Sequence, residues 1–280
     1  MRQLILQKNQ DKNGLVLVEG KDFHYLRQVL RVKVGDMVNL RLADGLPYDS
    51  TVCKIDDTSK RITLQVCAPT DVIASEARQS TSSIQFSLFQ FIPKPQKLEL
   101  IVRQATECGV KNIIPVISEY AQKGSVEALS GKKIERLERI VREARQQSGS
   151  PVDTKVFKPV TVEQAIEIWN KMKEEAGGEE NAAGFVLSER AVSAGPGPTQ
   201  HSCSGGSLKL LSQFFDARHV EGPQIVSIFC GNEGGISPDE LELLTKKALL
   251  QPVHFSVNIL RCETAALYGI AAVQTAILGF

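Results

Sequence analysis

The chain has 280 residues, 42% of them hydrophobic, and it carries a formal net charge of +1 at pH 7. A chain of this size can bury two cores without disulfides, and its near-neutral charge restricts any nucleic-acid footprint to a local patch. Its 6 cysteines form no C-x-x-C pair and no apolar run reaches about eighteen residues, which predicts a cytoplasmic protein with reduced thiols, no metal site and no membrane span.

Residues 1–72 show the pattern of a small β-barrel domain. Short runs that alternate apolar and polar side chains, such as 37–42 and 61–66, are separated by Asp-Gly and Asp-Asp turn signals. One helix is expected at about residues 22–30. The polar stretch 73–83 has no sustained periodicity, so we expect an interdomain linker there.

From residue 84 to residue 280, strand-like apolar runs alternate with helical patterns. This alternation predicts an α/β domain whose parallel sheet is covered by helices on both faces. The polar, Gly-rich segments 173–183 and 193–207 are expected to be surface insertions. The expected strands are 84–92, 112–118, 184–188, 224–230 and 252–257, and the expected helices are 95–108, 132–147, 161–174, 237–249 and 262–278.

Two loops near the C-terminus carry the strongest functional signal. One runs from Gly231 to Gly235 after an apolar strand, and the other, Asn258–Ala265, opens the last helix. Ligands of open α/β sheets bind at such strand ends. The first loop is not a phosphate cradle, because no Lys-Ser or Lys-Thr follows its glycines and Glu233 would repel an anion. A capping box at 237–240 also occupies the next helix N-terminus, so the loops favour a neutral or cationic ligand.

This pair of loops resembles the C-terminal signature of the SPOUT methyltransferases and, among them, the RsmE family, which methylates N3 of a uridine in 16S ribosomal RNA. Further matches are 97–110, 114–119 and 147–149, and residues 24–36 resemble the family's PUA-like barrel. The resemblance implies a SPOUT-type parallel sheet with a C-terminal trefoil knot over 84–280. It also implies S-adenosylmethionine as the cofactor, small-subunit ribosomal RNA or the 30S subunit as the partner, and a homodimer.

The resemblance and the chemistry together nominate site residues. Uridine N3 is a poor nucleophile until its proton leaves, so the site needs a base or a cation, and Arg261 and Glu263 are the catalytic candidates. Glu263 could instead complement the helix dipole, and Arg261 could instead form an ion pair with Glu263 or Glu233. Glu233 could bind a ribose hydroxyl or hold a loop N–H. The residues expected to contact the methyl donor are Leu187, Gly231, Glu233, Gly234, Val257, Ile259 and Leu260.

Basic residues of the barrel and of the helix at 132–147 are the candidates for RNA binding through phosphate. They are Arg27, Arg31, Arg41, Lys132, Lys133 and Arg145. The last helix is apolar on nearly every face, which indicates burial or a homodimer interface.

The chain departs from the family pattern where arginines are expected, at Tyr120, Ser150 and Asn258, and Asn232 replaces a proline. The cofactor is therefore more firmly indicated than the target nucleotide. Two alternatives stay open: a SPOUT enzyme that methylates a ribose 2′-hydroxyl, and a non-catalytic RNA-binding or ribosome-assembly factor with a vestigial site.

Overall fold

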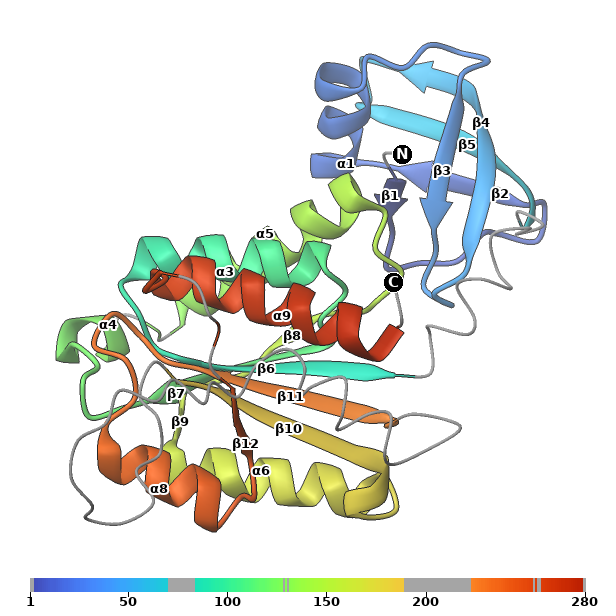
Figure 1. Cartoon of the computed structure of the whole chain (residues 1–280). Helices are drawn as coiled ribbons and strands as arrows, with labels where there is room; N and C mark the ends of the chain where they lie inside the picture. Colours follow the sequence, from blue (N-terminus) through green and yellow to red (C-terminus); the bar gives the residue numbers. More distant parts are fainter. Residues whose placement is uncertain are drawn as a thin grey trace, which may run out of the picture. The chain divides into compact units, whose positions relative to one another are not determined.

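The computed structural model describes residues 3–69, 84–127, 129, 131–188, 223–253, 255 and 258–278 of the chain (Figure 1). The predicted linker 73–83 and the predicted insertion 193–207 lie outside these residues. The chain divides into two compact units, of which the first comprises Met1–Arg78 with Arg145–Pro151 and the second comprises Gln79–Ala144 with Val152–Phe280. Within the described parts of the chain, no helix is both long and apolar enough to cross a membrane.

The first unit is a five-stranded curled sheet in the order β1-β3-β4-β5-β2. Strand β1 pairs parallel to β3, and the other neighbours are antiparallel. Two register shifts in the β4–β5 pair increase the local twist that curls such a sheet. The helix predicted at 22–30 is found as a short α-helix that continues directly into a short π-helix. The elements are β1 (Gln3–Ile5), β2 (Leu15–Val18), α1 (Gly20–His24), η1 (Tyr25–Val29), β3 (Met37–Arg41), β4 (Pro47–Asp56) and β5 (Arg61–Pro69).

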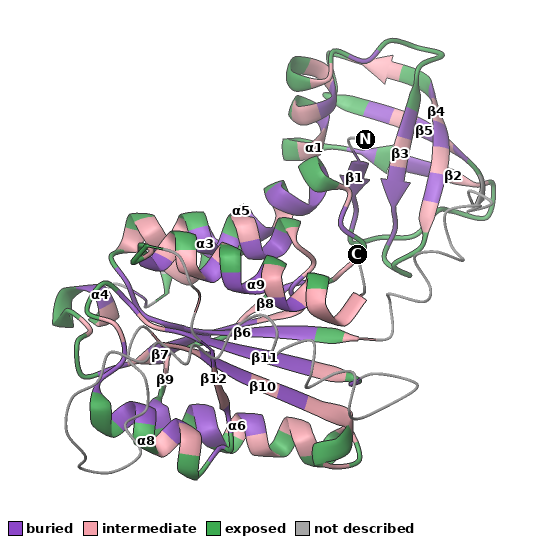
Figure 2. Cartoon of the chain, viewed as in Figure 1, coloured by how far each residue is buried: buried purple, intermediate pink, exposed green. Residues whose placement is uncertain are grey.

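The second unit is built on a seven-stranded parallel sheet in the order β12-β10-β11-β6-β7-β8, with β9 also paired to β7. The predicted α/β architecture is therefore confirmed. Figure 2 shows the central strands buried, as expected for a parallel sheet covered on both faces. The strands are β6 (Gln85–Phe91), β7 (Asn112–Ile117), β8 (Lys155–Val156), β9 (Val160–Thr161), β10 (Ala182–Leu187), β11 (Ile225–Cys230) and β12 (Gln251–Val253).

Helices cover the two faces of this sheet and enclose separate cores. One core lies between the sheet and α3, α5 and α9, and the other lies between the sheet and α6 and α8 (Figure 1). Both α6 and α8 begin with a capping box, and the one at Ser237 and Glu240 was predicted. The helices are α3 (Pro95–Glu107), α4 (Lys123–Glu127), α5 (Lys132–Ser148), α6 (Val162–Glu175), η2 (Glu179–Asn181), α8 (Pro238–Lys246) and α9 (Cys262–Leu278).

Residues 173–183 differ from the predicted surface insertion. They form the end of α6, a tight turn, η2 and the first residues of β10. Gly177 and Gly178 adopt positive φ angles of 92° and 121°, which lets the chain reverse in a few residues. Asn181 Nδ2 then donates a hydrogen bond of 2.9 Å to the Ala176 carbonyl. Composition alone missed this turn because its order comes from local hydrogen bonds and not from burial.

Candidate functional site

The glycine loop predicted from the sequence follows β11 at the carboxyl edge of the parallel sheet. Strand β6 pairs with β7 on one side and with β11 on the other, so the direction in which the chain adds strands reverses beside β6. Crevices at the carboxyl ends beside such a switch point are the usual ligand sites of open α/β sheets. The fold therefore places the predicted loop where a cofactor pocket is expected.

Buried side chains hold the glycine loop in one conformation. Asn232 Nδ2 donates to Ser118 Oγ at 3.0 Å, and its Oδ1 accepts a hydrogen bond from the Gly234 N–H at 2.9 Å. The fully buried Gln90 donates to the carbonyls of Cys230 and Gly231 at 3.2 and 3.1 Å. Asn232, which stands where the family has proline, thus fixes the loop through side-chain hydrogen bonds instead of a restricted backbone.

The glycines of this loop are required by close packing. A Cβ on Gly231 would lie 2.8 Å from the carbonyl carbon of Gly235, and a Cβ on Gly234 would lie 2.8 Å from Tyr120 Cβ. Gly235 also has a positive φ of 79°. A ligand that approaches this loop meets backbone atoms and the partly exposed ring of Tyr120.

Lys97 in the first turn of α3 joins the two predicted loops. Its Nζ lies 3.5 Å from Glu233 Oε1 in the glycine loop and 3.1 Å from Glu263 Oε2 at the start of α9. The backbone N–H of Lys94 donates to the same Glu233 oxygen at 3.2 Å. Sequence reasoning did not nominate Lys97, although it brings both predicted carboxylates into one cluster.

Electrostatics keep Lys97 and Glu263 of this cluster charged near neutral pH. Partial burial raises the pKa of Glu263, but hydrogen bonds from its own backbone N–H, Lys97 and Cys262 outweigh that effect and leave the pKa below its usual value. The hydrogen bond to Glu263 raises the pKa of Lys97. Burial raises the pKa of the Cys262 thiol to about 12, so Cys262 is a protonated, unreactive thiol and not a nucleophile.

The remaining cofactor and catalytic candidates lie as follows. Leu187 ends β10 and packs on α9, since a Cβ on Gly269 would lie 2.5 Å from its Cδ1. Leu260 is half-buried, Ile259 is 81% exposed, and Val257 lies outside the described residues. Arg261 is exposed, and no ion pair joins it to an acidic residue in the described part of the chain. The alternative in which Arg261 pairs with Glu233 or Glu263 is therefore not found. Lys97 binds both of these carboxylates instead.

The RNA-binding candidates are not equally available. Arg27 forms a two-point ion pair with Asp57, at 2.9 Å from Nε and 2.8 Å from Nη2. Arg41 and Arg145 are both 8% exposed, and burial together with Arg145 lowers the pKa of Arg41. Arg31 is exposed and Lys133 is half-buried, while Lys132 is the first residue of α5. The six residues remain predicted RNA contacts, of which Arg31 is the most accessible among those with described side chains.

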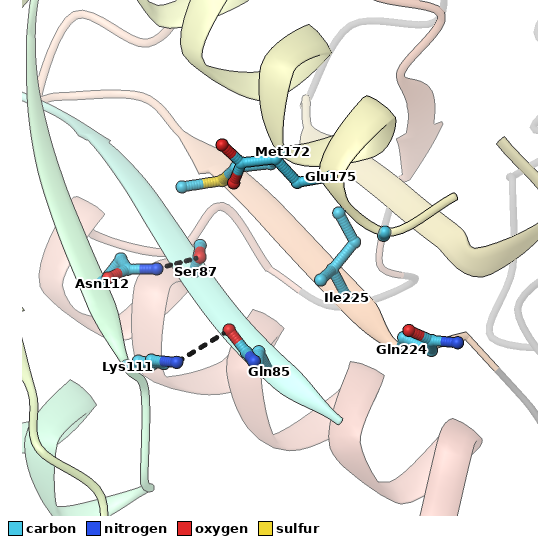
Figure 3. A pocket seen from close by; sticks show the side chains of 9 residues that line it. Gln85, Ser87, Lys111, Asn112, Met172, Glu175, Gln224 and Ile225 are labelled. Carbon is cyan, nitrogen blue, oxygen red and sulfur yellow. Dashed lines mark hydrogen bonds between the residues drawn. The ribbon is translucent and has the colours of Figure 1, made fainter. Parts of the chain in front are cut away.

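A cavity of ≈ 360 Å³ lies at the opposite edge of the sheet, beside the amino ends of β6, β7 and β11 (Figure 3). In it Lys111 donates to Gln85 and Asn112 donates to Ser87. None of the predicted site residues lines this cavity. Ligands of such sheets usually bind at the carboxyl ends of the strands, so this cavity lies at the edge where a cofactor is not expected.

The α/β fold agrees with the comparisons, which show an RNA methyltransferase. Residues 80–274 match the family described as RNA methyltransferase domain, and the chain belongs to this family. The resemblance to RsmE proteins is also confirmed, because several curated relatives carry the name ribosomal RNA small subunit methyltransferase E.

Individual relatives cover nearly the whole chain. The protein of that name from Rickettsia conorii is 29% identical over 264 residues, which is 94% of this chain and 91% of the relative. The protein of that name from Buchnera aphidicola is 23% identical over 273 residues, covering 98% and 92%. A solved structure of ribosomal RNA small subunit methyltransferase E from Neisseria gonorrhoeae, bound to S-adenosyl methionine, has a TM-score of 0.69 and 21% identity, covering 98% and 97%.

Proposed function

We propose that this protein transfers a methyl group from S-adenosylmethionine to N3 of a uridine in small-subunit (16S) ribosomal RNA. One observation supports the proposal most strongly: the two predicted loops lie close together at the carboxyl edge of the sheet, where Lys97 binds Glu233 of one loop and Glu263 of the other. The names of the curated relatives support small-subunit ribosomal RNA as the substrate. The N3 position follows from the resemblance to the RsmE family.

The residues of the site suit S-adenosylmethionine. When bound, this cofactor supplies a methyl group activated by a sulfonium cation, and it carries no phosphate. Glu233 and Glu263 provide the negative charge that a cation favours, and the bare backbone at Gly231 and Gly234 allows close approach. We assign cofactor binding to these glycines and Glu233, together with Leu187, Val257, Ile259 and Leu260.

The geometry favours charge stabilisation over a carboxylate base. Uridine N3 becomes nucleophilic when its proton passes to solvent water, and the resulting negative charge is shared by O2 and O4 of the ring. Glu263 has a lowered pKa and is bound to Lys97, so it is a weak base. Arg261 precedes α9 and has no described carboxylate partner, so its guanidinium is available to stabilise the developing anion. Positioning of N3 in line with the methyl carbon supplies much of the remaining catalysis.

The partner and oligomeric state follow from the same proposal. Thr264, Tyr268, Ala271 and Thr275 follow one another on an exposed face of α9, and this face combines small side chains with an exposed aromatic ring. We propose that this face contributes to a homodimer interface, in which aromatic residues are enriched. We further propose that the enzyme acts in the cytoplasm on the 30S subunit or its RNA, and that the chain around the loops forms the trefoil knot of its family.

Methyl transfer from labelled S-adenosylmethionine to small ribosomal subunits, followed by digestion and nucleoside analysis, tests the proposal. We expect label in 3-methyluridine. Label in a ribose-methylated nucleoside would replace the proposal by the 2′-hydroxyl alternative. Absence of both label and calorimetric cofactor binding would favour the non-catalytic alternative.

A further inference from the structure

Lys97 occupies a position that α3 by itself does not favour. The helix begins at Pro95, so Lys97 lies in the first turn, and no acidic residue of the helix lies in that turn. A cation near a helix N-terminus is unfavourable because the dipole makes that end positive. The carboxylates that offset this charge come from two other segments, namely Glu233 and Glu263.

The contacts of Lys97 connect segments that are far apart in the sequence. Glu233 belongs to the loop after β11 and also accepts the backbone N–H of Lys94, the N-cap residue of α3. Glu263 lies in the first turn of α9, where its negative charge complements the dipole. The N-terminus of α3 therefore contacts both loops of the proposed cofactor site, through Lys94 and Lys97.

The cluster is partly shielded from water. The Lys97 side chain is 27% exposed, and the side chains of Glu233 and Glu263 are 33% and 15% exposed. Ion pairs at this depth are screened less than pairs on the open surface. The exposed pair of Lys246 and Glu242 within α8 is different, since its side chains are 73% and 60% exposed and it links residues of a single helix.

We propose that Lys97 is a positioning residue, which binds Glu233 and Glu263 together and thereby holds the two loops in the arrangement that receives the methyl donor. The inference rests on the proposed function of the same site. Lys97 does not act on the uridine. Its role is to set the distance between the loops and to keep Glu263 an ionised acceptor.

This role predicts a change in the pH profile. In the described structure the groups that act on Glu263 are Lys97 on α3 and Cys262 on α9, while Glu233 faces Lys97 from the glycine loop. Without Lys97, the burial that raises the pKa of Glu263 is less opposed. In the native protein the pKa of Glu263 lies below its ordinary value of 4.5. Any loss of activity at low pH that is caused by protonation of Glu263 therefore occurs below pH 4.5. In a Lys97→Met variant this loss of activity should begin at a higher pH.

The experiment compares Lys97→Met, Lys97→Gln and Lys97→Arg, with Lys246→Met as the matched control for loss of one ion-paired lysine. Cofactor affinity is measured by calorimetry, kcat and KM by methyl transfer to small subunits, and folding by thermal unfolding. We expect Lys97→Met and Lys97→Gln to raise the Kd for S-adenosylmethionine roughly tenfold, as expected for one lost charge-assisted hydrogen bond. Lys97→Arg should restore most of the affinity, and Lys246→Met should leave Kd, kcat and the pH profile unchanged.

A double variant separates positioning from a general loss of stability. If Lys97 acts through Glu263, then Glu263→Gln should have a smaller effect on Kd in the Lys97→Met background than in the native background. Native-like Kd and pH profile in both Lys97→Met and Lys97→Gln, or equal losses in the Lys246→Met control, would overturn the inference. Failure of the native protein to bind the cofactor would instead overturn the proposed function, so the two failures are distinguishable.

Discussion

Replacing Gly234 by alanine should weaken cofactor binding through a steric conflict that the structure locates. A Cβ at this position would lie 2.8 Å from Tyr120 Cβ and 3.1 Å from Tyr120 Cγ and Cδ2. The nearest atom is the Cβ of Tyr120, which does not move when its side chain rotates. Relief therefore requires a backbone shift of the glycine loop or of the segment that carries Tyr120.

Both backbones are restrained. The Gly234 N–H is bound by Asn232, whose amide also holds Ser118, and the Glu119 N–H donates to buried Glu240 at 2.8 Å. Overpacking of a well-packed site typically costs about 1–3 kcal/mol. If the shift displaces the loop, a cost near the middle of that range corresponds to a loss of cofactor affinity of roughly tenfold or more.

Calorimetric titration of the Gly234→Ala variant with S-adenosylmethionine measures this effect. Gly124→Ala is the matched control, because a Cβ on Gly124 in α4 meets no atom within 4 Å. Combining Gly234→Ala with Tyr120→Gly removes the conflicting side chain and should restore part of the affinity. Unchanged binding by Gly234→Ala, or no gain from the added Tyr120→Gly change, would refute the reasoning.

Three further predictions concern single side chains. Asn232→Ala should lower the free energy of unfolding by about 1–3 kcal/mol, because it removes the hydrogen bonds of Asn232 with the Gly234 N–H and the Ser118 hydroxyl. Chemical denaturation measures this free energy, and unchanged stability would contradict the role of Asn232. Arg261→Ala should lower kcat roughly 100-fold with little change in the Kd for the cofactor, as expected for a group that stabilises transition-state charge; equal kcat in the two proteins would exclude that role. Glu263→Gln should retain kcat within about tenfold at pH 7, because a carboxylate with a lowered pKa is a poor base; a loss of several orders of magnitude in the same methyl-transfer assay would restore Glu263 as the base.

Local patterns predicted the elements well because their causes are local. The β-branched run of β11, the capping box at Ser237 and Glu240, and the glycines at Gly231 and Gly234 each reflect a requirement within a few residues. The strand order, by contrast, depends on pairings between distant segments such as β6 and β11. The family resemblance implied a parallel sheet of the SPOUT type, but the sequence analysis did not predict the strand order, because periodicity does not reveal which distant segments pair.

The site residues that sequence reasoning missed depend on contacts across the fold. Lys97 approaches Cys262 across 165 residues of sequence, and Asn232 reaches Ser118 across 114. A lysine in the first turn of α3 was nevertheless a signal, because its charge opposes the helix dipole. The replacement of proline by Asn232 was read as a departure from the family, but the structure shows that its side chain fixes the loop.

Charge in the sequence did not reveal which cations are available to RNA. Arg27 binds a carboxylate 30 residues away in the sequence, and Arg41 is buried. Composition counts each arginine equally, whereas burial and pairing decide whether its guanidinium can meet a phosphate. Arg31, two residues after η1 and with a positive φ of 54°, is exposed.

The most direct test of the cofactor site is a nuclear magnetic resonance titration of the backbone amides with S-adenosylmethionine. We predict that the largest shifts fall in residues 231–235 and 258–263, together with Lys94 and Lys97. Shifts centred instead on Gln85, Lys111 and Asn112, which line the cavity at the amino edge of the sheet, would contradict the assignment of the methyl donor to the two loops.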